Sequence, residues 1–296
     1  MPPAAQVAFT TPYRTAPYLT VQEYRTAPTG VNTSDLAPGG QPNTEDAILA
    51  DVIGYASGWI DDICNQILAA TVDTEAKRLR PSRDGSLIVP TDNWPILEVR
   101  DVQYGTTPAA LQQLGDLTGL WIEERQFIVT ASGLAFTTSA GPLQLGGFLP
   151  GRRLLVRYTY VNGWPNALLA ADVATAAVSI TVTDPTGIYA GTRLRVDTGA
   201  LEELVTVSAT PTTSAVAISA LTHDHKAGVS VTALPPVVKQ AAILLTSALI
   251  KTRSQEALVM PALAGIPELG QVAQTGGGSR DVADAKEMLL NLQRTR

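Results

Sequence analysis

Residues 152–165 read RRLLVRYTYVNGWP, and this stretch carries the clearest strand pattern in the chain. Leu154, Val156, Tyr158 and Tyr160 alternate with Leu155, Arg157, Thr159 and Val161, which is the period of two that a strand requires. Asn162-Gly163 predicts a turn that ends it. Shorter β-prone runs separated by turn signals precede it, so residues 78–162 are predicted to be rich in strands.

The chain on the carboxyl side of this stretch shows a second group of short strands. Between residues 168 and 234, β-prone runs recur at short and regular spacing, with turn signals at Asp184-Pro185-Thr186-Gly187, Thr198-Gly199 and Lys226-Ala227-Gly228. Spacing of this kind is typical of a small barrel or sandwich. We therefore expect residues 168–234 to form an inserted small β domain.

Three stretches show helical periodicity instead. In residues 44–69, Ile48, Val52, Ala56, Ile63 and Ile67 repeat at helical spacing, and Glu45 and Asp46 lie in the first turn, where the helix dipole favours acids. A second helix is predicted from Val237 to Arg253, after Pro235-Pro236. Asp281 can cap a last helix, preceded by Gly276-Gly277-Gly278, which predicts a flexible joint.

These patterns divide the chain into four parts. Residues 1–43, with recurrent proline, are predicted to be an extended N-terminal arm. Residues 44–167 together with 235–256 are predicted to form the core, which contains the strand-rich part 78–162. The small β domain 168–234 interrupts this core, and residues 257–296 form a C-terminal flexible segment and helix.

The composition argues against an enzyme. The 296 residues include two His, one Cys and five Lys, the residue types on which active sites depend most. The net charge of −6 argues against binding of nucleic acid by a basic surface, and only 16% of residues are charged, which suits a chain covered in an assembly. No apolar run reaches membrane-spanning length, and the start lacks a signal-peptide pattern, so we expect a cytoplasmic location.

The few clusters of reactive residues are predicted to have structural or surface roles and no chemical function. His223-Asp224-His225 resembles a metal-binding motif, but no Cys or further His exists to complete a zinc site, and a polar loop is favoured. Cys64 is predicted to be a buried, inert thiol. Asp61-Asp62 and Glu123-Glu124 are adjacent in sequence and point in different directions on a helix or a strand, so they are predicted to be surface charges. We predict no catalytic, cofactor-binding or metal-binding residue.

The arm contains a short repeat. Tyr13-Arg14-Thr15-Ala16-Pro17 recurs as Tyr24-Arg25-Thr26-Ala27-Pro28. One interpretation is a pair of docking strips for a partner, made by Tyr13, Arg14, Tyr18, Tyr24 and Arg25. The alternative is chance repetition in a segment of biased composition, and this alternative is favoured.

The order of several soft motifs resembles a known family. Ala56-Ser57-Gly58-Trp59-Ile60-Asp61 on a helix is followed by Trp94-Pro95-Ile96-Leu97-Glu98-Val99, by Tyr158-Thr159-Tyr160-Val161-Asn162-Gly163-Trp164-Pro165 and by an Ala-rich closing helix. This order resembles the head-to-tail connector, or adaptor, proteins of long-tailed bacteriophages of actinobacterial hosts. The resemblance implies an α+β fold built on a small helical bundle, with the strand-rich region and the small β-barrel or sandwich module added to it.

The resemblance also implies a function. The chain would be a structural virion protein that forms a ring homo-oligomer, expected to be a dodecamer, under the portal protein in the phage neck, after assembly in the host cytoplasm. The ring would extend the DNA channel without specific DNA binding and would join the head to the stopper or tail-terminator proteins. Residues 257–296 would dock on the portal, with Met288, Leu292, Arg294 and Arg296 as contacts. The alternatives are another virion part, such as a tail-completion or decoration protein, or a glycan-binding tail component.

Overall fold

The computed structural model describes residues 14–33, 36, 41–82, 86–129, 135–138, 141–144, 153–253 and 277–294. The chain divides into two compact units. The first, which we call the sandwich unit, comprises Ala70–Gly163 and, among the described residues of the N-terminal stretch, Arg14. The second, the helical–barrel unit, comprises Thr15–Ala69 and Trp164–Arg296, so that the sandwich unit is inserted into it.

The larger sheet of the sandwich unit is built on the strand that the alternating pattern predicts. Its order is β1-β9-β3-β4, formed by β1 (Thr71–Leu79), β9 (Leu154–Asn162), β3 (Ile96–Gly105) and β4 (Gln112–Gln113). β9 pairs antiparallel with β1 and β3 on either side of it. Because side chains alternate along a strand, Leu154, Val156, Tyr158 and Tyr160 all point into the core and are fully buried.

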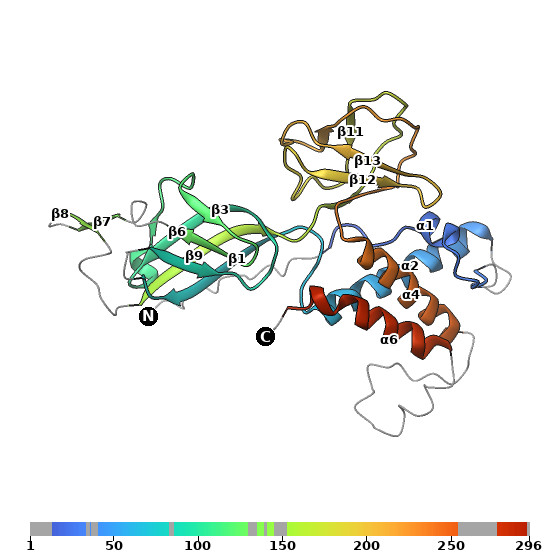
Figure 1. Cartoon of the computed structure of the whole chain (residues 1–296), viewed down its shortest axis with the longest axis horizontal. Coiled ribbons are helices and arrows are strands. Elements are labelled where there is room, and N and C mark those ends of the chain that lie inside the picture. Colours follow the sequence, from blue (N-terminus) through green and yellow to red (C-terminus); the bar gives the residue numbers. More distant parts are fainter. Residues whose placement is uncertain are drawn as a thin grey trace, which may run out of the picture. The chain divides into compact units, whose positions relative to one another are not determined.

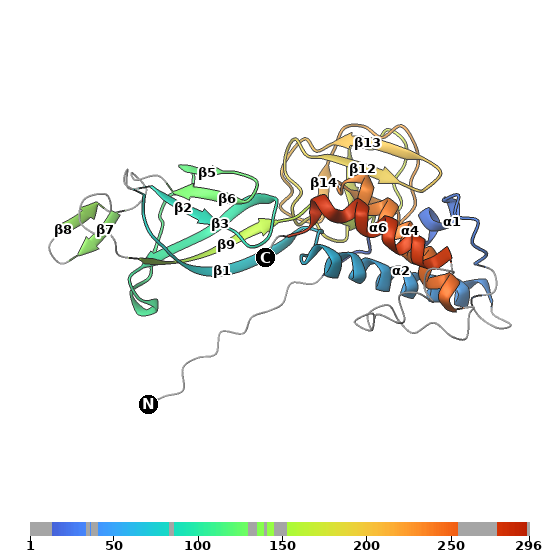
Figure 2. The same ribbon diagram turned by 60° about the horizontal axis from the view of Figure 1, so that its bottom comes forward.

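A second sheet closes this core from the other side. It has the order β2-β6-β5, formed by β2 (Leu87–Pro90), β6 (Gln126–Val129) and β5 (Leu120–Ile122). Figure 2 shows the two sheets as two layers, and their inward side chains belong to one hydrophobic cluster. The unit also holds a 3-10 turn, Pro108–Ala110, and a hairpin of β7 (Ala135–Thr138) and β8 (Gly141–Gln144).

Residues 166–232 form a small barrel with its own core. One sheet has the order β10-β15-β12-β13, formed by β10 (Asn166–Leu168), β15 (Ser230–Thr232), β12 (Arg193–Asp197) and β13 (Glu202–Thr206). A hairpin of β11 (Ser179–Thr181) and β14 (Ala215–Ala217) completes it. Antiparallel bridges join Leu169 to Val182 and Val207 to Ile218, so the ladder of strands closes on itself.

Four helices are present in the described part of the chain. They are α1 (Val21–Thr26), α2 (Pro42–Cys64), α4 (Pro236–Arg253) and α6 (Gly277–Leu289), and a 3-10 turn, Leu290–Leu292, follows the last. Helices α2, α4 and α6 contact one another and lie side by side in Figure 1. The buried stripe of α2 includes Leu49, Val52, Ile53, Ala56 and Ile60. Of the predicted stripe, Val52 and Ala56 are buried, Ile48 and Ile63 are only partly buried, and Ile67 lies beyond the end of the helix.

The described part of the predicted N-terminal arm is not simply extended. Thr20 caps α1 by accepting a hydrogen bond from the Glu23 amide, and the Glu23 carboxylate accepts one from the Thr20 amide at 2.6 Å. This capping box explains a helix in a proline-rich segment, because it satisfies two backbone donors that would otherwise lack partners. Tyr18, Leu19 and Tyr24 are buried, so this stretch belongs to the core of its unit.

The predicted flexible joint before the last helix is wrong where the structure describes it. Gly277 and Gly278 lie inside α6. The helix packs on the same chain, since Ala285 and Leu289 are fully buried and Lys251 of α4 pairs with Asp281 at 2.7 Å. The described part of the C-terminal segment is therefore a structural element of the helical–barrel unit.

The predicted α+β fold with a small helical bundle at its centre is also wrong. The structure is mostly β-sheet: of the described residues, 32% lie in strands and 28% in helices, and α1 is short. The physical reason is that the strand-forming segments do not pack as additions on a central helical bundle. Each set buries its own apolar faces, one in the core of the sandwich and one in the core of the barrel.

A substitution at Gly199 tests how closely α1 packs against the barrel. Its φ is +85°, and an added Cβ would meet Glu23 Cα at 2.7 Å and the Thr26 hydroxyl. We expect Gly199→Ala to lower the free energy of unfolding by about 3 kcal/mol, through backbone strain and loss of α1 docking. Gly191→Ala is the control, because Gly191 has a φ of +84° and open space around it. It should cost about 1 kcal/mol. Equal losses in urea unfolding would contradict close packing of α1.

Candidate functional site

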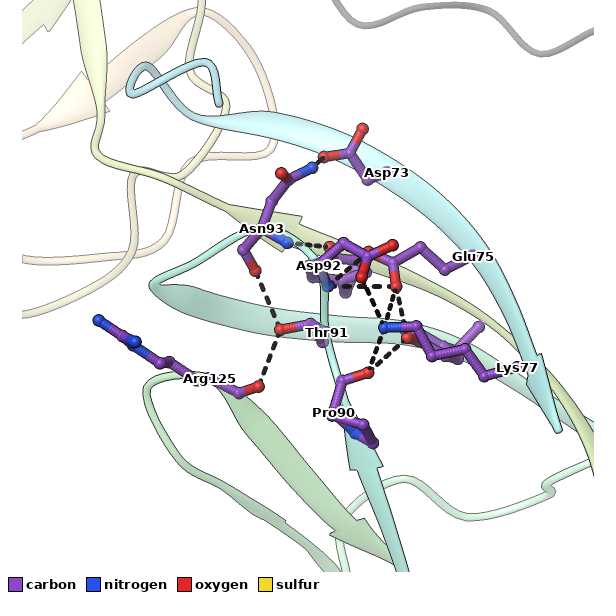
Figure 3. Close-up of polar contacts among 10 residues, drawn as sticks. Asp73, Glu75, Lys77, Pro90, Thr91, Asp92, Asn93 and Arg125 are labelled. Carbon is purple, nitrogen blue, oxygen red and sulfur yellow. Dashed lines mark hydrogen bonds and ion pairs between the residues drawn. The ribbon is translucent and has the colours of Figure 1, made fainter. Parts of the chain in front are cut away.

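The densest polar cluster of the sandwich unit surrounds Glu75 on β1 (Figure 3). Its carboxylate accepts hydrogen bonds from the hydroxyl of Tyr158 at 2.6 Å, from the hydroxyl of Tyr160, and from the amide of Asp92 at 2.9 Å. Lys77 pairs with Glu75 at 3.0 Å and with Asp92 at 2.9 Å. The Glu75 carboxylate is thus surrounded by donors from its own chain, and these donors hold it in place.

Asp73, two residues earlier on the same face of β1, has a similar environment. Its Oδ2 accepts hydrogen bonds from the side-chain amides of Asn162 at 2.6 Å and Asn93 at 2.9 Å, and from the Thr71 hydroxyl at 3.3 Å. The two carboxylates therefore bind the segment 90–93 to the sheet (Figure 3). Two carboxylates on one strand face could suggest acid–base catalysis, but these two are saturated with structural partners.

The two tyrosines of this cluster are held in their neutral form. Burial raises the pKa of Tyr158 and of Tyr160 far above the ordinary value of 10, and the nearby Glu75 charge raises both further. Neutral hydroxyl groups can donate to Glu75 throughout the physiological pH range. The cluster ends at Arg125, whose guanidinium lies 4.3 Å from the centre of the Trp94 ring, and whose carbonyl accepts the Thr91 amide at 3.1 Å.

The His223-Asp224-His225 loop is likewise structural. Glu203 on β13 is buried and accepts hydrogen bonds from the amide and hydroxyl of Thr222 at 2.5 and 2.8 Å, and His225 Nε2 lies 3.1 Å from its Oε2. Asp224 points elsewhere and caps the Thr175 amide at 2.6 Å. Among the residues that the structure describes, no group of three His, Cys, Asp or Glu side chains could hold a metal ion. The polar-loop interpretation of the sequence fits this geometry.

A charged triad joins three elements of the helical–barrel unit. Lys239 on α4 pairs with Asp197 on β12 and with Glu23 on α1, the second pair at 3.2 Å. Burial raises the pKa of Glu23 above 4.5, although the charge of Lys239 opposes this. Burial lowers the pKa of Lys239, but the hydrogen bond to Asp197 and the charge of Glu23 outweigh it and raise that pKa above 10.5. The ammonium group therefore stays charged between two buried carboxylates.

Most of the arm residues that were predicted as partner contacts bind other residues of the same chain. The Tyr18 hydroxyl donates to Asp61 and accepts from the amides of Leu68 and Ala69. The Tyr24 hydroxyl lies 3.0 Å from Ser247 Oγ. Arg25 pairs with Asp46, and Arg14 is half-buried. Tyr13 lies outside the described residues. The buried rings of Tyr18 and Tyr24 are thus not part of the exposed surface, because they pack the start of the chain against α2 and α4.

The predicted partner contacts near the C-terminus also include residues that contact the chain itself and residues that are exposed. Leu292 is buried, and its carbonyl accepts a hydrogen bond from Gln66 at 3.2 Å. The Arg294 amide donates to the Cys64 carbonyl at 2.8 Å. Met288 is 38% exposed and its neighbour Leu290 is 57% exposed. Arg296 lies outside the described residues. The end of α6 therefore offers a small apolar surface, and the residues after it are anchored to α2.

Cys64 is buried as the sequence predicts. Burial, together with the nearby charge of Asp61, raises the pKa of its thiol to about 12. The thiolate is the nucleophilic form of cysteine, so this thiol is inert at neutral pH.

A groove of about 650 Å³ in the helical–barrel unit is lined by α1, by α2 and by the 224–229 segment. Its charged residues already have partners. Asp46 pairs with Arg25, Asp197 with Lys239 and Lys226 with Asp172, while Asp224 caps Thr175. Among the charged residues that line the groove, Asp224 alone makes no ion pair, and its carboxylate is held by the amide and hydroxyl of Thr175.

One surface of the sandwich unit stands apart from these structural clusters. Ile88 on β2, Ile128 on β6 and Trp121 on β5 are direct partners in the ladder and share the outward face of the three-stranded sheet. Trp121 is 66% exposed and Ile88 is 43% exposed. We call these three residues the apolar face. The row across the three strands becomes visible only with the register of strand pairing.

Comparisons with protein-family models, with curated proteins and with solved structures find no match. Among the described residues, the helices fall short of the length and apolar character that crossing a membrane requires.

The charged triad predicts a large effect for one substitution. Lys239→Met should leave the carboxylates of Glu23 and Asp197 buried without their cation, and we expect it to lower the free energy of unfolding by about 3 kcal/mol. Lys226→Met is the matched control. Lys226 pairs with Asp172, but the two side chains are 82% and 60% exposed, so its loss should change stability very little. Urea unfolding followed by circular dichroism measures both, and equal effects would show that the triad is not stabilising.

Glu203 predicts a pH dependence. Burial raises its pKa, but hydrogen bonds from Thr222, His225 and His223 outweigh burial and hold the pKa below 4.5. The unfolded chain therefore binds a proton more readily, so Glu203 stabilises the fold above about pH 4.5 and this contribution is lost as the pH falls through its folded-state pKa.

Glu203→Gln should consequently be less stable than the wild type at pH 7 and should lose less stability between pH 5 and about pH 3. Glu202→Gln, at the exposed neighbouring position, controls for removal of one negative charge. Unfolding free energies measured across this range provide the check. Parallel pH profiles for the wild type and Glu203→Gln would refute the role assigned to Glu203.

Proposed function

We propose that the chain is a non-enzymatic structural protein of a virion, a head-to-tail adaptor that forms a ring under the portal in the phage neck. One observation carries the proposal: the buried charged groups described above hold the chain's own segments together, while Trp121 is left 66% exposed on a regular sheet face. Trp121 shares this face with Ile88 and Ile128, and a contiguous exposed apolar patch that contains tryptophan is typical of a protein interface.

The motifs that resemble the adaptor family support this function through their structural positions. The helical motif that starts at Ala56 lies in α2, and the motif that ends at Pro165 follows β9 into the helical–barrel unit. There the Trp164 amide donates to the Leu68 carbonyl at 2.8 Å, and Ala69 and Trp164 form a bridge. These motifs pack the helices and hold together the two points where the chain leaves and re-enters the helical–barrel unit. Structural roles of this kind are expected of a family whose members share an architecture and no catalytic activity. The fold class lends no support, because the structure is mostly β-sheet.

The charge of the chain is compatible with a DNA conduit. A net charge of −6 lets a ring surround DNA without binding its phosphates, since like charges repel. In this proposal the portal lies on one side of the ring and the stopper or tail-terminator proteins on the other. Met288 and Leu290, the exposed apolar residues at the end of α6, are candidate contacts for one of these neighbours.

Another virion position, such as tail completion or decoration, would need the same exposed surfaces and stays an alternative. A glycan-binding tail component is less well supported by the side chains. Glycan sites commonly use rows of exposed aromatic rings, but Trp94 is buried and Trp59 and Trp164 are only partly exposed. Trp121 therefore lies beside aliphatic side chains and not in an aromatic row.

Purification with the portal protein of the same phage tests the proposal. We expect annular particles in negative-stain electron microscopy and co-elution of the two proteins in size-exclusion chromatography. Imaging of intact virions should place the chain between head and tail. A chain that stays monomeric with and without the portal would contradict the adaptor function, and density on the capsid surface would favour a decoration protein.

A further inference from the structure

The outward face of the larger sheet in the sandwich unit differs in charge from the apolar face. Ala76 on β1 pairs with Arg157 on β9, Arg78 pairs with Leu155, and Val72 pairs with Val161. Val72, Ala76, Arg78, Leu155 and Arg157 point away from the core of the sandwich, because the alternate residues of β9 fill that core, whereas Val161 is fully buried at its own register position. Arg78 and Arg157 are exposed, and Val72 is 41% exposed. We call Val72, Ala76, Arg78 and Arg157 the basic face.

The apolar face has an acidic border. Glu123 and Glu124 follow β5 directly after the row that contains Trp121, and both are exposed. Glu123 accepts a hydrogen bond from Gln126 at 2.6 Å. Within the described part of the chain, neither glutamate makes an ion pair, and neither do Arg78 and Arg157. The unit thus carries two acids without ion pairs beside the apolar face and two arginines without ion pairs on the basic face, where β3 adds the carboxylate of Asp101 opposite Thr159.

We propose that the apolar face docks on the basic face of a second copy of this chain. Trp121 and Ile88 would pack on Val72, Ala76 and the aliphatic stems of Arg78 and Arg157, whose guanidinium groups would meet Glu123 and Glu124. Pairing of two apolar faces would instead bring the glutamates of both copies together, which is unfavourable. The charges therefore favour contact between unlike faces.

This geometry matches the requirement of a ring. The two faces lie on opposite sides of one sandwich, because both sheets cover a single core. Contact between unlike faces is heterologous, so each copy can bind one neighbour on each side, and repetition closes a ring when the rotation permits. The inference deepens the proposed function and rests on it, because it names the surfaces that join neighbouring subunits.

The size of the contact predicts its strength. The three-stranded sheet has two strands of four residues and one of three, and it measures roughly 14 Å by 13 Å. Its area is much less than the roughly 800 Å² that each partner buries in a stable complex. One such contact should be weak between two isolated copies. In a closed ring each subunit makes the contact twice, alongside its other contacts, and the assembly is then much more stable than a pair.

Charge reversal and rescue test the contact. In Glu124→Arg the border of the apolar face is reversed, and in Arg157→Glu the basic face is reversed. Each variant alone should associate about tenfold more weakly than the wild type at low salt, as measured by sedimentation velocity. An equimolar mixture of the two variants restores opposite charges at both contacts and should regain association, as should the double variant. Circular dichroism checks that each variant is folded.

Trp121 provides an independent measurement. Comparison of the wild type with Trp121→Phe isolates the fluorescence of this ring, which acrylamide should quench in the free chain and not in the assembled ring. Trp121→Ser should weaken association, whereas Leu204→Ser, at a barrel position that is 58% exposed, should not.

The outcomes separate the two proposals. Rescue by the mixture together with protection of Trp121 supports the contact. Rings that form equally well from the single reversal variants, or in which Trp121 stays fully quenchable, overturn this inference and leave the adaptor function intact. A wild-type chain that forms no ring, alone or with the portal, overturns both.

Discussion

The helical–barrel unit depends on one cation between two buried acids. Lys239 of α4 lies between Asp197 of the barrel and Glu23 of α1, which are 4% and 3% exposed. Asp197 also accepts the Gly199 amide at 2.6 Å, where the turn after β12 meets the backbone of α1. A charge buried without a partner is far less stable than one in water. The three elements must therefore assemble together, and the triad fixes the barrel on the helices.

Local patterns allowed part of this fold to be predicted. The periodicity of Leu154–Tyr160 identified β9, and helical spacing identified α2 and α4, because each signal lies within one element. The capping box of Thr20 and Glu23 was also present in the sequence, and it would have revealed α1 if proline had not been given more weight. Closure of the barrel depends on pairs such as Leu169 with Val182, which no local pattern specifies.

The candidate surfaces could not be predicted from residue counts. The scarcity of His and Cys can be counted directly in the sequence. By contrast, Ile88 and Trp121 are separated by more than thirty positions and become neighbours only because both pair with Ile128. The roles of Tyr18 and Tyr24 were not visible either, since burial depends on what α2 and α4 place against them. That the chain is an assembly protein stays a prediction from residue type, and tertiary structure was needed to distinguish core from surface.

The crossing between the two units has a consequence for evolution. The chain leaves the helical–barrel unit after Ala69 and returns at Trp164, and these two residues form a bridge with one another. Because exit and return lie side by side, a short linker could replace everything between them without moving the ends. The intervening 94 residues are thus a cassette that genetic exchange could swap or delete while its host remained foldable. Related chains could differ completely in this cassette and still share the same scaffold.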